Sequence, residues 1–247
     1  MLRGWDRYAG AWHPRKFREV VLPGHPVTHV GDEWTAERSG ERRTTYGLPP
    51  EIVTRFEAYV RERLLDPYLP ASAEEGLEIG PGGGRLTALL LPRTGLLHAA
   101  EPARAMLAHL KRRFADAPNL RCYRTDGVTL PRLRPGSLDY VVAFDVFVHF
   151  EPRLIYWYLR QIAALLKPGG VGILHYATLL TPTGWQQFER DLELNLKQRT
   201  FFAAFGVMCP EMMGTFLERL GLQVVSVDLG LIPRDAVAVF RTPRRTA

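Results

Sequence analysis

The sequence predicts an α/β protein built on one mostly parallel, doubly wound sheet. Two observations support this prediction: short apolar runs alternate with helical patterns from about residue 75 onward, and a cluster of glycines follows the first apolar run. Alternation of this kind is typical of βαβ units, in which helices connect neighbouring parallel strands. Two apolar runs near the end of the chain, 222–229 and 236–240, predict an antiparallel hairpin at one edge of the sheet.

Strands and helices are assigned from the length and spacing of apolar residues. Five apolar runs of strand length precede the hairpin and bring the expected number of strands to seven: 75–79, 96–100, 120–123, 138–144 and 171–176. Five segments repeat apolar residues with helical spacing: 85–91, 102–117, 152–165, 183–196 and 211–220. Pro102 and Pro152 stand at the first helical position, where proline is best tolerated, and Gly221 is expected to end the last helix.

The first fifty residues differ in character from the rest. Prolines interrupt this segment, yet it is too aromatic for a disordered tail: Trp5, Tyr8, Trp12, Phe17, Trp34 and Tyr46. We therefore expect residues 1–50 to form an aromatic cap on a domain of residues 51–247, joined to it by a helix from Pro50 to about Leu65. An insertion near 178–210 is expected to add a further wall to the binding pocket of the domain.

Composition places the chain among ordinary globular proteins. Of its 247 residues 46% are hydrophobic and 23% charged, and no apolar run reaches the roughly 20 residues that span a bilayer. The first residues lack the apolar core of a secretory signal, so a cytoplasmic location without a membrane partner is expected. The net charge of +6 would suit nucleic acid, but acidic residues separate the basic ones, so that partner is not favoured.

Several kinds of site are excluded by the motifs that the chain lacks. Its two cysteines, Cys122 and Cys209, have no neighbours at metal-ligand spacing, so neither a disulfide nor a metal site is expected. No His-Glu-x-x-His and no Gly-x-Ser-x-Gly occurs, which argues against a zinc protease or a serine hydrolase.

The glycine cluster lies in the loop between the first strand and the first helix. Its glycines at 80, 82 and 84 provide a tight turn and let a ligand approach the backbone closely. The third glycine of a dinucleotide fingerprint would stand at position 85, where the chain has Arg85, and no Lys-Ser or Lys-Thr pair completes a P-loop. Glu101 ends the second strand, where a carboxylate can accept hydrogen bonds from both hydroxyls of an adenosine ribose.

Together these motifs resemble those of class I methyltransferases that use S-adenosylmethionine, and the resemblance covers about residues 75–177. Glu78 with the three glycines is similar to the first motif of the family, and Glu101 to its ribose-binding acid. Thr125-Asp126-Gly127 resembles the segment that contacts adenine, 138–146 the fourth-strand motif, and 166–170 the turn before the fifth strand. The resemblance implies a Rossmann-like fold, S-adenosylmethionine as cofactor, and these cofactor-binding residues: Glu78, Gly80, Gly82, Gly84, Glu101, Asp126, Gly127, Phe144 and Asp145.

The acceptor of the methyl group is expected near the ends of the fourth and fifth strands. His149 is the first candidate for a general base, because an unperturbed histidine titrates near pH 6.5, and His175 and Tyr176 are the reserve candidates. His149 has a competing structural interpretation, in which it caps the helix at Pro152 or packs beneath it.

We expect a small organic acceptor, such as a secondary metabolite. The alternatives are an RNA or protein methyltransferase, or a non-catalytic binding module on the same fold. The Asn/Asp-Pro-Pro-Tyr/Phe motif of adenine-amine methylases is missing at 145–148, which argues against a DNA adenine methylase. Oxygen, nitrogen and carbon all remain open as the methylated atom, and the oligomeric state is open as well.

Overall fold

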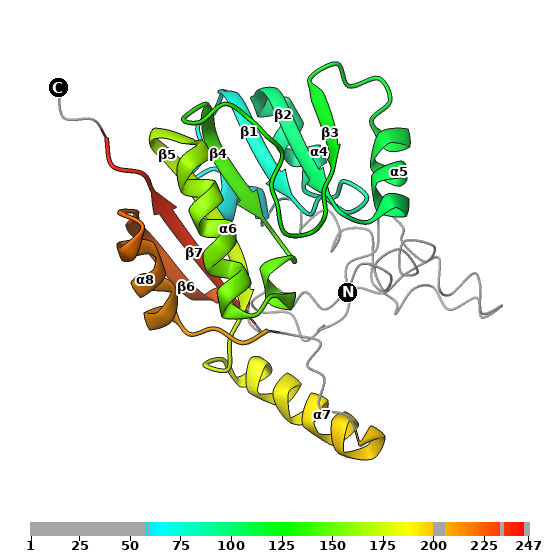
Figure 1. Cartoon of the computed structure of the whole chain (residues 1–247), viewed down its shortest axis with the longest axis vertical. Coiled ribbons are helices and arrows are strands. Elements are labelled where there is room, and N and C mark those ends of the chain that lie inside the picture. Colours follow the sequence, from blue (N-terminus) through cyan, green and yellow to red (C-terminus); the bar gives the residue numbers. More distant parts are fainter. Residues whose placement is uncertain (1–57, 59, 200–205, 233–234, 245–247) are drawn as a thin grey trace. The chain divides into compact units, whose positions relative to one another are not determined.

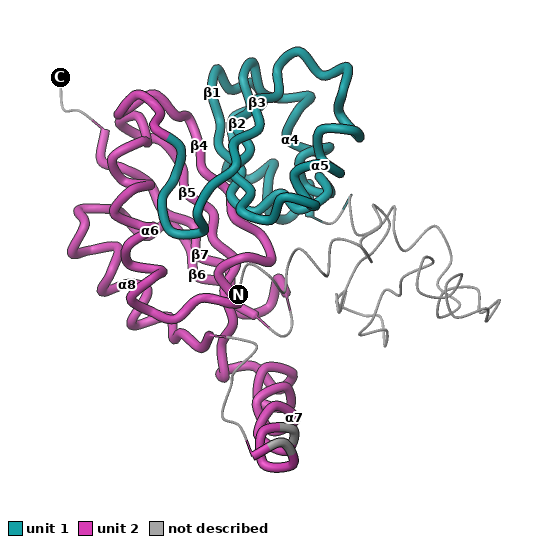
Figure 2. The backbone as a smooth tube through the Cα atoms, turned by 45° about the vertical axis from the view of Figure 1, so that its right-hand side comes forward, with its two compact units in different colours: residues 1–131 teal, residues 132–247 magenta. Residues whose placement is uncertain are grey.

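The computed structural model describes residues 58, 60–199, 206–232 and 235–244 (Figure 1). The expected aromatic cap of residues 1–50 lies outside the described residues, as does most of the expected helix between Pro50 and Leu65. The chain divides into two compact units, residues 1–131 and 132–247 (Figure 2). The strands of both units belong to one sheet in the order β3-β2-β1-β4-β5-β7-β6.

The first unit contributes three parallel strands, β1 (Ala73–Ile79), β2 (Thr94–Glu101) and β3 (Leu120–Arg124). Leu77 lies beside His98 and Leu97 beside Leu120, so the carboxyl ends of β1 and β2 fall at the same level. Helix α5 (Arg104–Arg113) packs Leu107 and Leu110 against Ala99 of β2. This packing fixes α5, and with it the loop that follows β2.

The helix expected at 85–91 is shorter than the apolar spacing indicates. Helix α4 covers only Thr87–Leu90, and a 3-10 turn, η3 (Leu91–Arg93), follows it. The segment continues through Pro92 as a 3-10 turn. A proline is tolerated at the start of a helical turn, because the N–H group that it lacks would not form a helical hydrogen bond at that position.

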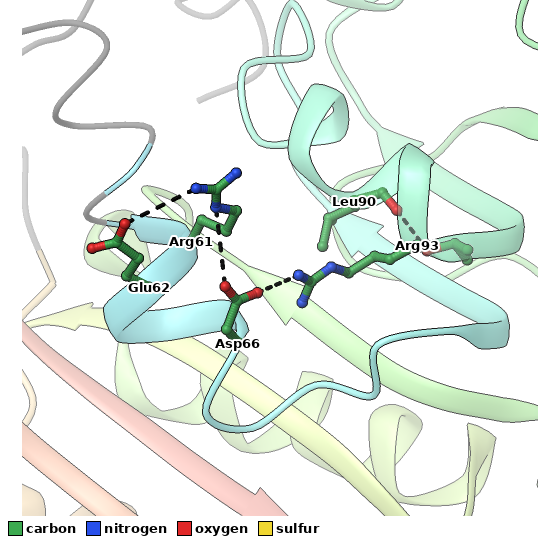
Figure 3. A network of polar contacts seen from close by, with 6 residues as sticks. Arg61, Glu62, Asp66, Leu90 and Arg93 are labelled. Atoms are coloured by element: carbon green, nitrogen blue, oxygen red, sulfur yellow. Dashed lines mark hydrogen bonds and ion pairs between the residues drawn. The ribbon is translucent and has the colours of Figure 1, made fainter.

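An ionic network connects the segment before β1 to the turn before β2 (Figure 3). The short π-helical segment η2 (Arg61–Leu65) is followed by Asp66, whose carboxylate pairs with Arg93 and lies 4.0 Å from Arg61. The Thr94 hydroxyl donates to the carbonyl of Leu90 at 2.7 Å, which closes the same turn. These contacts hold the segment before β1 against the end of the β1–β2 connection.

The second unit contains β4 (Leu138–Ala143), β5 (Leu166–Ala177), β6 (Gln223–Ile232) and β7 (Asp235–Arg241). β4 and β5 are parallel, whereas β7 is antiparallel to both β5 and β6. Seven strands, mostly parallel with an antiparallel C-terminal hairpin, confirm the predicted fold class.

Helices α6 (Pro152–Leu165) and α8 (Pro210–Arg219) cover one face of this unit's sheet (Figure 1). Pro152 begins α6, and Gly221 (φ +69°) ends α8, with the amide of Leu222 donating to the carbonyl of Leu217 at 2.9 Å. Both ends are as predicted, the second because a left-handed residue closes a helix most easily when it is glycine.

β5 begins earlier than expected. Residues 166–170 were predicted to form a turn, but β5 starts at Leu166, which pairs with Leu138, and the next pair joins Val171 to Tyr140. The turn residues are therefore a bulge within the strand, and Gly169 has a φ of +80° there. Lys167, predicted to be part of a turn only, pairs with Asp139 at 2.8 Å and links the bulge to β4.

Helix α7 (Pro182–Gln198) confirms the helix expected at 183–196. The Thr181 hydroxyl caps it by accepting from the amide of Gly184 at 3.0 Å. Trp185 and Phe188 lie on its exposed surface with ring centroids 5.4 Å apart. Within the described residues, no helix is both long and apolar enough to cross a membrane.

Candidate active site

The glycine loop after β1 has the conformation for which glycine is required. Gly82 has a φ of +55°, which lets its amide donate to Oε2 of Glu101 at 3.0 Å. Gly84 has a φ of +89°, and a Cβ there would lie 2.7 Å from Leu110 and even closer to the ring of Phe114. Gly82 thus serves the contact between the loop and Glu101, and Gly84 serves the close packing of the loop on α5.

Glu101 is buried where β2 ends, with 5% of its surface exposed. Its Oε1 accepts from the amide of Ala103 at 2.8 Å, and its Oε2 accepts from the amide of Gly82. The two amides fix the carboxylate between the glycine loop and the first turn of α5. A carboxylate can accept several hydrogen bonds at once, so this arrangement is compatible with further bonds from ribose hydroxyls.

Glu78, the acid of the first motif, is buried beneath the loop rather than on its surface. Only 2% of it is exposed, and its Oε2 accepts from the Thr87 hydroxyl at 2.5 Å. The pKa of this carboxyl is raised from 4.5 to about 7, mainly by burial and also by the nearby Glu101 carboxylate, whereas the Thr87 bond and the charges of Arg113 and Arg85 oppose the rise. Through its hydrogen bond with Thr87, Glu78 therefore links the end of β1 to the start of α4.

Arg113 is a residue of this site that the sequence analysis missed. Its guanidinium donates to the carbonyl oxygen of Gly84 at 2.8 Å and to that of Gly83 at 3.3 Å. The sequence shows a basic cluster at 111–113 at the end of a helix, which the helix dipole alone would explain. No spacing rule relates Arg113 to a loop thirty residues earlier, so only the structure reveals that it holds the glycine loop.

Asp126 and Gly127 shape the loop that follows β3. Oδ1 of Asp126 accepts from the amides of Val128 at 2.8 Å and Thr129 at 2.6 Å, and these bonds hold the pKa of the exposed carboxyl below its usual value. Gly127 has a φ of +81°, which lets the chain turn immediately after the acid. The predicted contact of Asp126 with the adenine amine stays a prediction.

In the second unit, Phe144 and Asp145 follow β4 and both contact His175 of β5. The amide of Asp145 donates to Nδ1 of His175 at 3.1 Å, and the rings of Phe144 and His175 stack with centroids 4.5 Å apart. Nε2 of His175 lies 3.0 Å from Oδ2 of Asp235. Asp235, the first residue of β7, is a second residue that the sequence analysis missed, because it lies sixty positions from its partner.

The three candidate bases occupy different surroundings. His149 is half-buried in the 3-10 turn η4 (Phe147–His149), and the side chain that caps α6 is that of Glu151, which accepts from the amides of Arg153 and Leu154. His175 uses both ring nitrogens within the protein. Tyr176 is fully buried, and its burial raises the pKa of the phenol, which disfavours a proton-accepting role. A base role for His149 stays a prediction.

Within the described part of the chain, no three His, Cys, Asp or Glu side chains are grouped so that they could hold a metal ion. The cysteines Cys122 and Cys209 are both free thiols.

Residues 77–171 match a family model described as a methyltransferase domain. The matched range begins within β1, includes the glycine loop, and extends through β4 and α6 into β5. Residues 77–171 therefore form a methyltransferase domain of class I. Domains of this class take their methyl group from S-adenosylmethionine, and the expected family and cofactor are thereby confirmed.

Two relatives illustrate how far the likeness extends. The domain is 32% identical over 124 residues to ribosomal RNA small subunit methyltransferase A of Methylococcus capsulatus, an alignment covering 44% of this chain and 48% of that protein. It is 29% identical over 181 residues to a biotin biosynthesis bifunctional protein of Cellvibrio japonicus, covering 68% of this chain and 33% of that protein. The chain thus spans half or less of the length of these relatives.

Solved structures share the fold of the methyltransferase domain at low sequence identity. One is magnesium protoporphyrin IX methyltransferase from Synechocystis with bound S-adenosylhomocysteine, which is 14% identical. The TM-score is 0.56, and the superposition covers 78% of this chain and 82% of that chain.

Proposed function

We propose that this protein transfers the methyl group of S-adenosylmethionine to a small organic acceptor. The observation that carries the proposal is the buried carboxylate of Glu101, fixed by two backbone amides at the point where β2 ends. A carboxylate in that place can accept hydrogen bonds from the two ribose hydroxyls of an adenosine. The rigid placement of this carboxylate supports a binding role, because a preorganised hydrogen-bond acceptor loses little side-chain entropy when a ligand binds.

The residues of the first unit fit the cofactor. Glu101 would hold the ribose, the loop of Gly80, Gly82 and Gly84 would approach the cofactor with its backbone, and Asp126 would receive the adenine amine. When bound, S-adenosylmethionine supplies a methyl group that is already activated by its sulfonium. The chain then mainly has to orient the acceptor and exclude water, and orientation of this kind can contribute roughly 7–11 kcal/mol to lowering a barrier.

Residues at the ends of β4 and β5 are proposed to face the acceptor. His149 would take a proton from the nucleophile in those acceptors that must lose one, a contribution typically worth about 10²–10⁴-fold. We also propose that residues 1–50 cap the domain of residues 51–247 and that α7 forms part of the acceptor wall, because α7 has exposed aromatic side chains that an apolar acceptor could contact.

A small acceptor is favoured over RNA by the distribution of charge. The basic residues of the chain are spread among acidic ones, whereas RNA-binding surfaces concentrate them. One similar protein is named for biotin biosynthesis and another for magnesium protoporphyrin IX, and both biotin and magnesium protoporphyrin IX are small molecules. The second candidate function, RNA methylation, is supported by several relatives named as ribosomal RNA methyltransferases and by the net charge of +6.

The decisive experiment follows a labelled methyl group from S-adenosylmethionine into a cell extract that has been separated into small molecules, RNA and protein. The Glu101→Ala variant serves as the inactive control. We expect label in the small-molecule fraction with the wild-type protein alone. Label in RNA or protein would support those acceptors instead, and binding of the cofactor without transfer to any fraction would support a non-catalytic module.

A further inference from the structure

A buried chain of hydrogen bonds joins the ends of three neighbouring segments in the second unit. It runs from Asp235 at the start of β7, through His175 near the end of β5, to the backbone of Asp145 after β4. His175 is 1% exposed and Asp235 is fully buried, so both polar side chains have left water and depend on their protein partners.

The donors and acceptors in this series of hydrogen bonds determine the tautomer of His175. A backbone amide can only donate, so Nδ1 of His175, 3.1 Å from the amide of Asp145, must be the unprotonated nitrogen. In a neutral imidazole the proton is then on Nε2, which lies 3.0 Å from the carboxylate of Asp235. Both ring nitrogens are thereby engaged, and the ring is held in one orientation.

The amide that donates to His175 belongs to Asp145, which has an unusual backbone conformation. Asp145 has a φ of +61°, a left-handed conformation that costs an L-residue other than glycine free energy. The hydrogen bond to Nδ1 of His175 helps to offset that cost and to direct the chain where it leaves β4. The same imidazole stacks on Phe144, so one side chain holds two consecutive residues.

We propose that His175 and Asp235 are positioning residues for the cofactor: Asp235 selects the tautomer of His175, and His175 orients Phe144 and Asp145 for contact with S-adenosylmethionine. The inference rests on the proposed function, in which Phe144 and Asp145 bind the cofactor. It assigns His175 a role through other residues, and not the role of a general base.

Two substitutions of His175 separate the contacts of its two nitrogens. In His175→Asn, the amide oxygen can take the place of Nδ1 and accept from Asp145, whereas the contact with Asp235 is lost. In His175→Gln, the longer side chain reaches the position of Nε2 and Asp235, whereas the acceptor for Asp145 is lost. His98→Gln is the matched control, because His98 is also a buried strand histidine with polar partners on both ring nitrogens.

The measurement is the affinity for S-adenosylhomocysteine by calorimetry, with thermal melting of each variant alongside. We expect His175→Gln to bind about 3- to 10-fold more weakly, the effect of one net hydrogen bond, while His175→Asn retains more of the affinity even if it melts at a lower temperature. Asp235→Asn, which allows either tautomer, should fall between the wild type and His175→Gln. His98→Gln should bind normally.

Two results would overturn the inference. One is equal or weaker binding by His175→Asn than by His175→Gln; the other is a loss in His98→Gln as large as in His175→Gln, since that would be a general effect of packing. If the variants do not fold, ring ¹⁵N chemical shifts of the wild-type protein decide, because the inference requires the proton of His175 on Nε2. Failure of the wild-type protein itself to bind S-adenosylhomocysteine would contradict the proposed function instead.

Discussion

Replacing Glu78 by glutamine should remove much of the pH dependence of the stability of the fold. The buried carboxyl of Glu78 has a pKa of about 7 in the folded protein, against 4.5 for an ordinary glutamate. Because the folded pKa is the higher one, the stabilising contribution is fully present below pH 4.5 and is lost as the pH rises through 7. Glutamine has nearly the same shape and can accept from the Thr87 hydroxyl, but it does not ionise.

The magnitude follows from the two pKa values. At about 1.36 kcal/mol for each pKa unit, the rise from 4.5 to about 7 corresponds to roughly 3 kcal/mol once the carboxyl is ionised in both states. Most of that amount, about 2–3 kcal/mol, falls between pH 5 and pH 8. Relative to the wild-type protein, Glu78→Gln should therefore become more stable by about this amount as the pH is raised across that interval.

Urea unfolding at several pH values between 5 and 8 measures this difference directly. Other titrating groups affect both proteins equally, so they cancel when the two curves are subtracted. Glu74→Gln is the matched control, because Glu74 is exposed on the same strand, and its curve should run parallel to that of the wild type. If the curve of Glu78→Gln also runs parallel to the wild type, the burial argument for Glu78 is refuted.

Three further substitutions test the loop and the candidate bases. Gly84→Ala should lower the melting temperature more than Gly136→Ala: both glycines have positive φ values, so each substitution costs about 1–2 kcal/mol, but only the new Cβ at position 84 meets side chains of α5. Equal losses would show that packing on α5 does not matter. Tyr176→Phe should leave stability unchanged or raise it by up to about 1 kcal/mol, because the buried hydroxyl has no hydrogen-bond partner in the described structure, and turnover should persist; a large loss of turnover would make Tyr176 a catalytic candidate again. His149→Gln should lower turnover about tenfold or more and remove the acidic limb of the pH–rate profile; near-normal turnover would leave catalysis to orientation alone.

Local patterns in the sequence were enough to predict the strands, their order of connection and the residues of the glycine loop. The loop glycines and Glu101 were found because each stands at a fixed place relative to a strand end, and the structure brings Gly82 and Glu101 into direct contact. Pro152 and Gly221 marked helix ends for equally local reasons. Such features depend on neighbours within a few residues, so they can be recognised from the sequence alone.

The contacts that hold the site in place could not be predicted in the same way. Thr87 on Glu78, Arg113 on the loop carbonyls and Asp235 on His175 all join residues from different elements. No periodicity relates such partners, because their distance in space is set by how the elements pack. For the same reason, burial of Glu78 and the engagement of both nitrogens of His175 emerge only from the structure.

The central claim is that Glu101 holds the ribose of S-adenosylmethionine, and calorimetric titration of the cofactor into wild type and Glu101→Ala tests it most directly. Two charge-assisted hydrogen bonds of roughly 1.5–3 kcal/mol each set the scale, so the variant should bind on the order of 100-fold more weakly. A melting curve must accompany the titration, because Glu101 also accepts from the amides of Gly82 and Ala103. A folded Glu101→Ala that binds S-adenosylmethionine as tightly as the wild type would contradict the account.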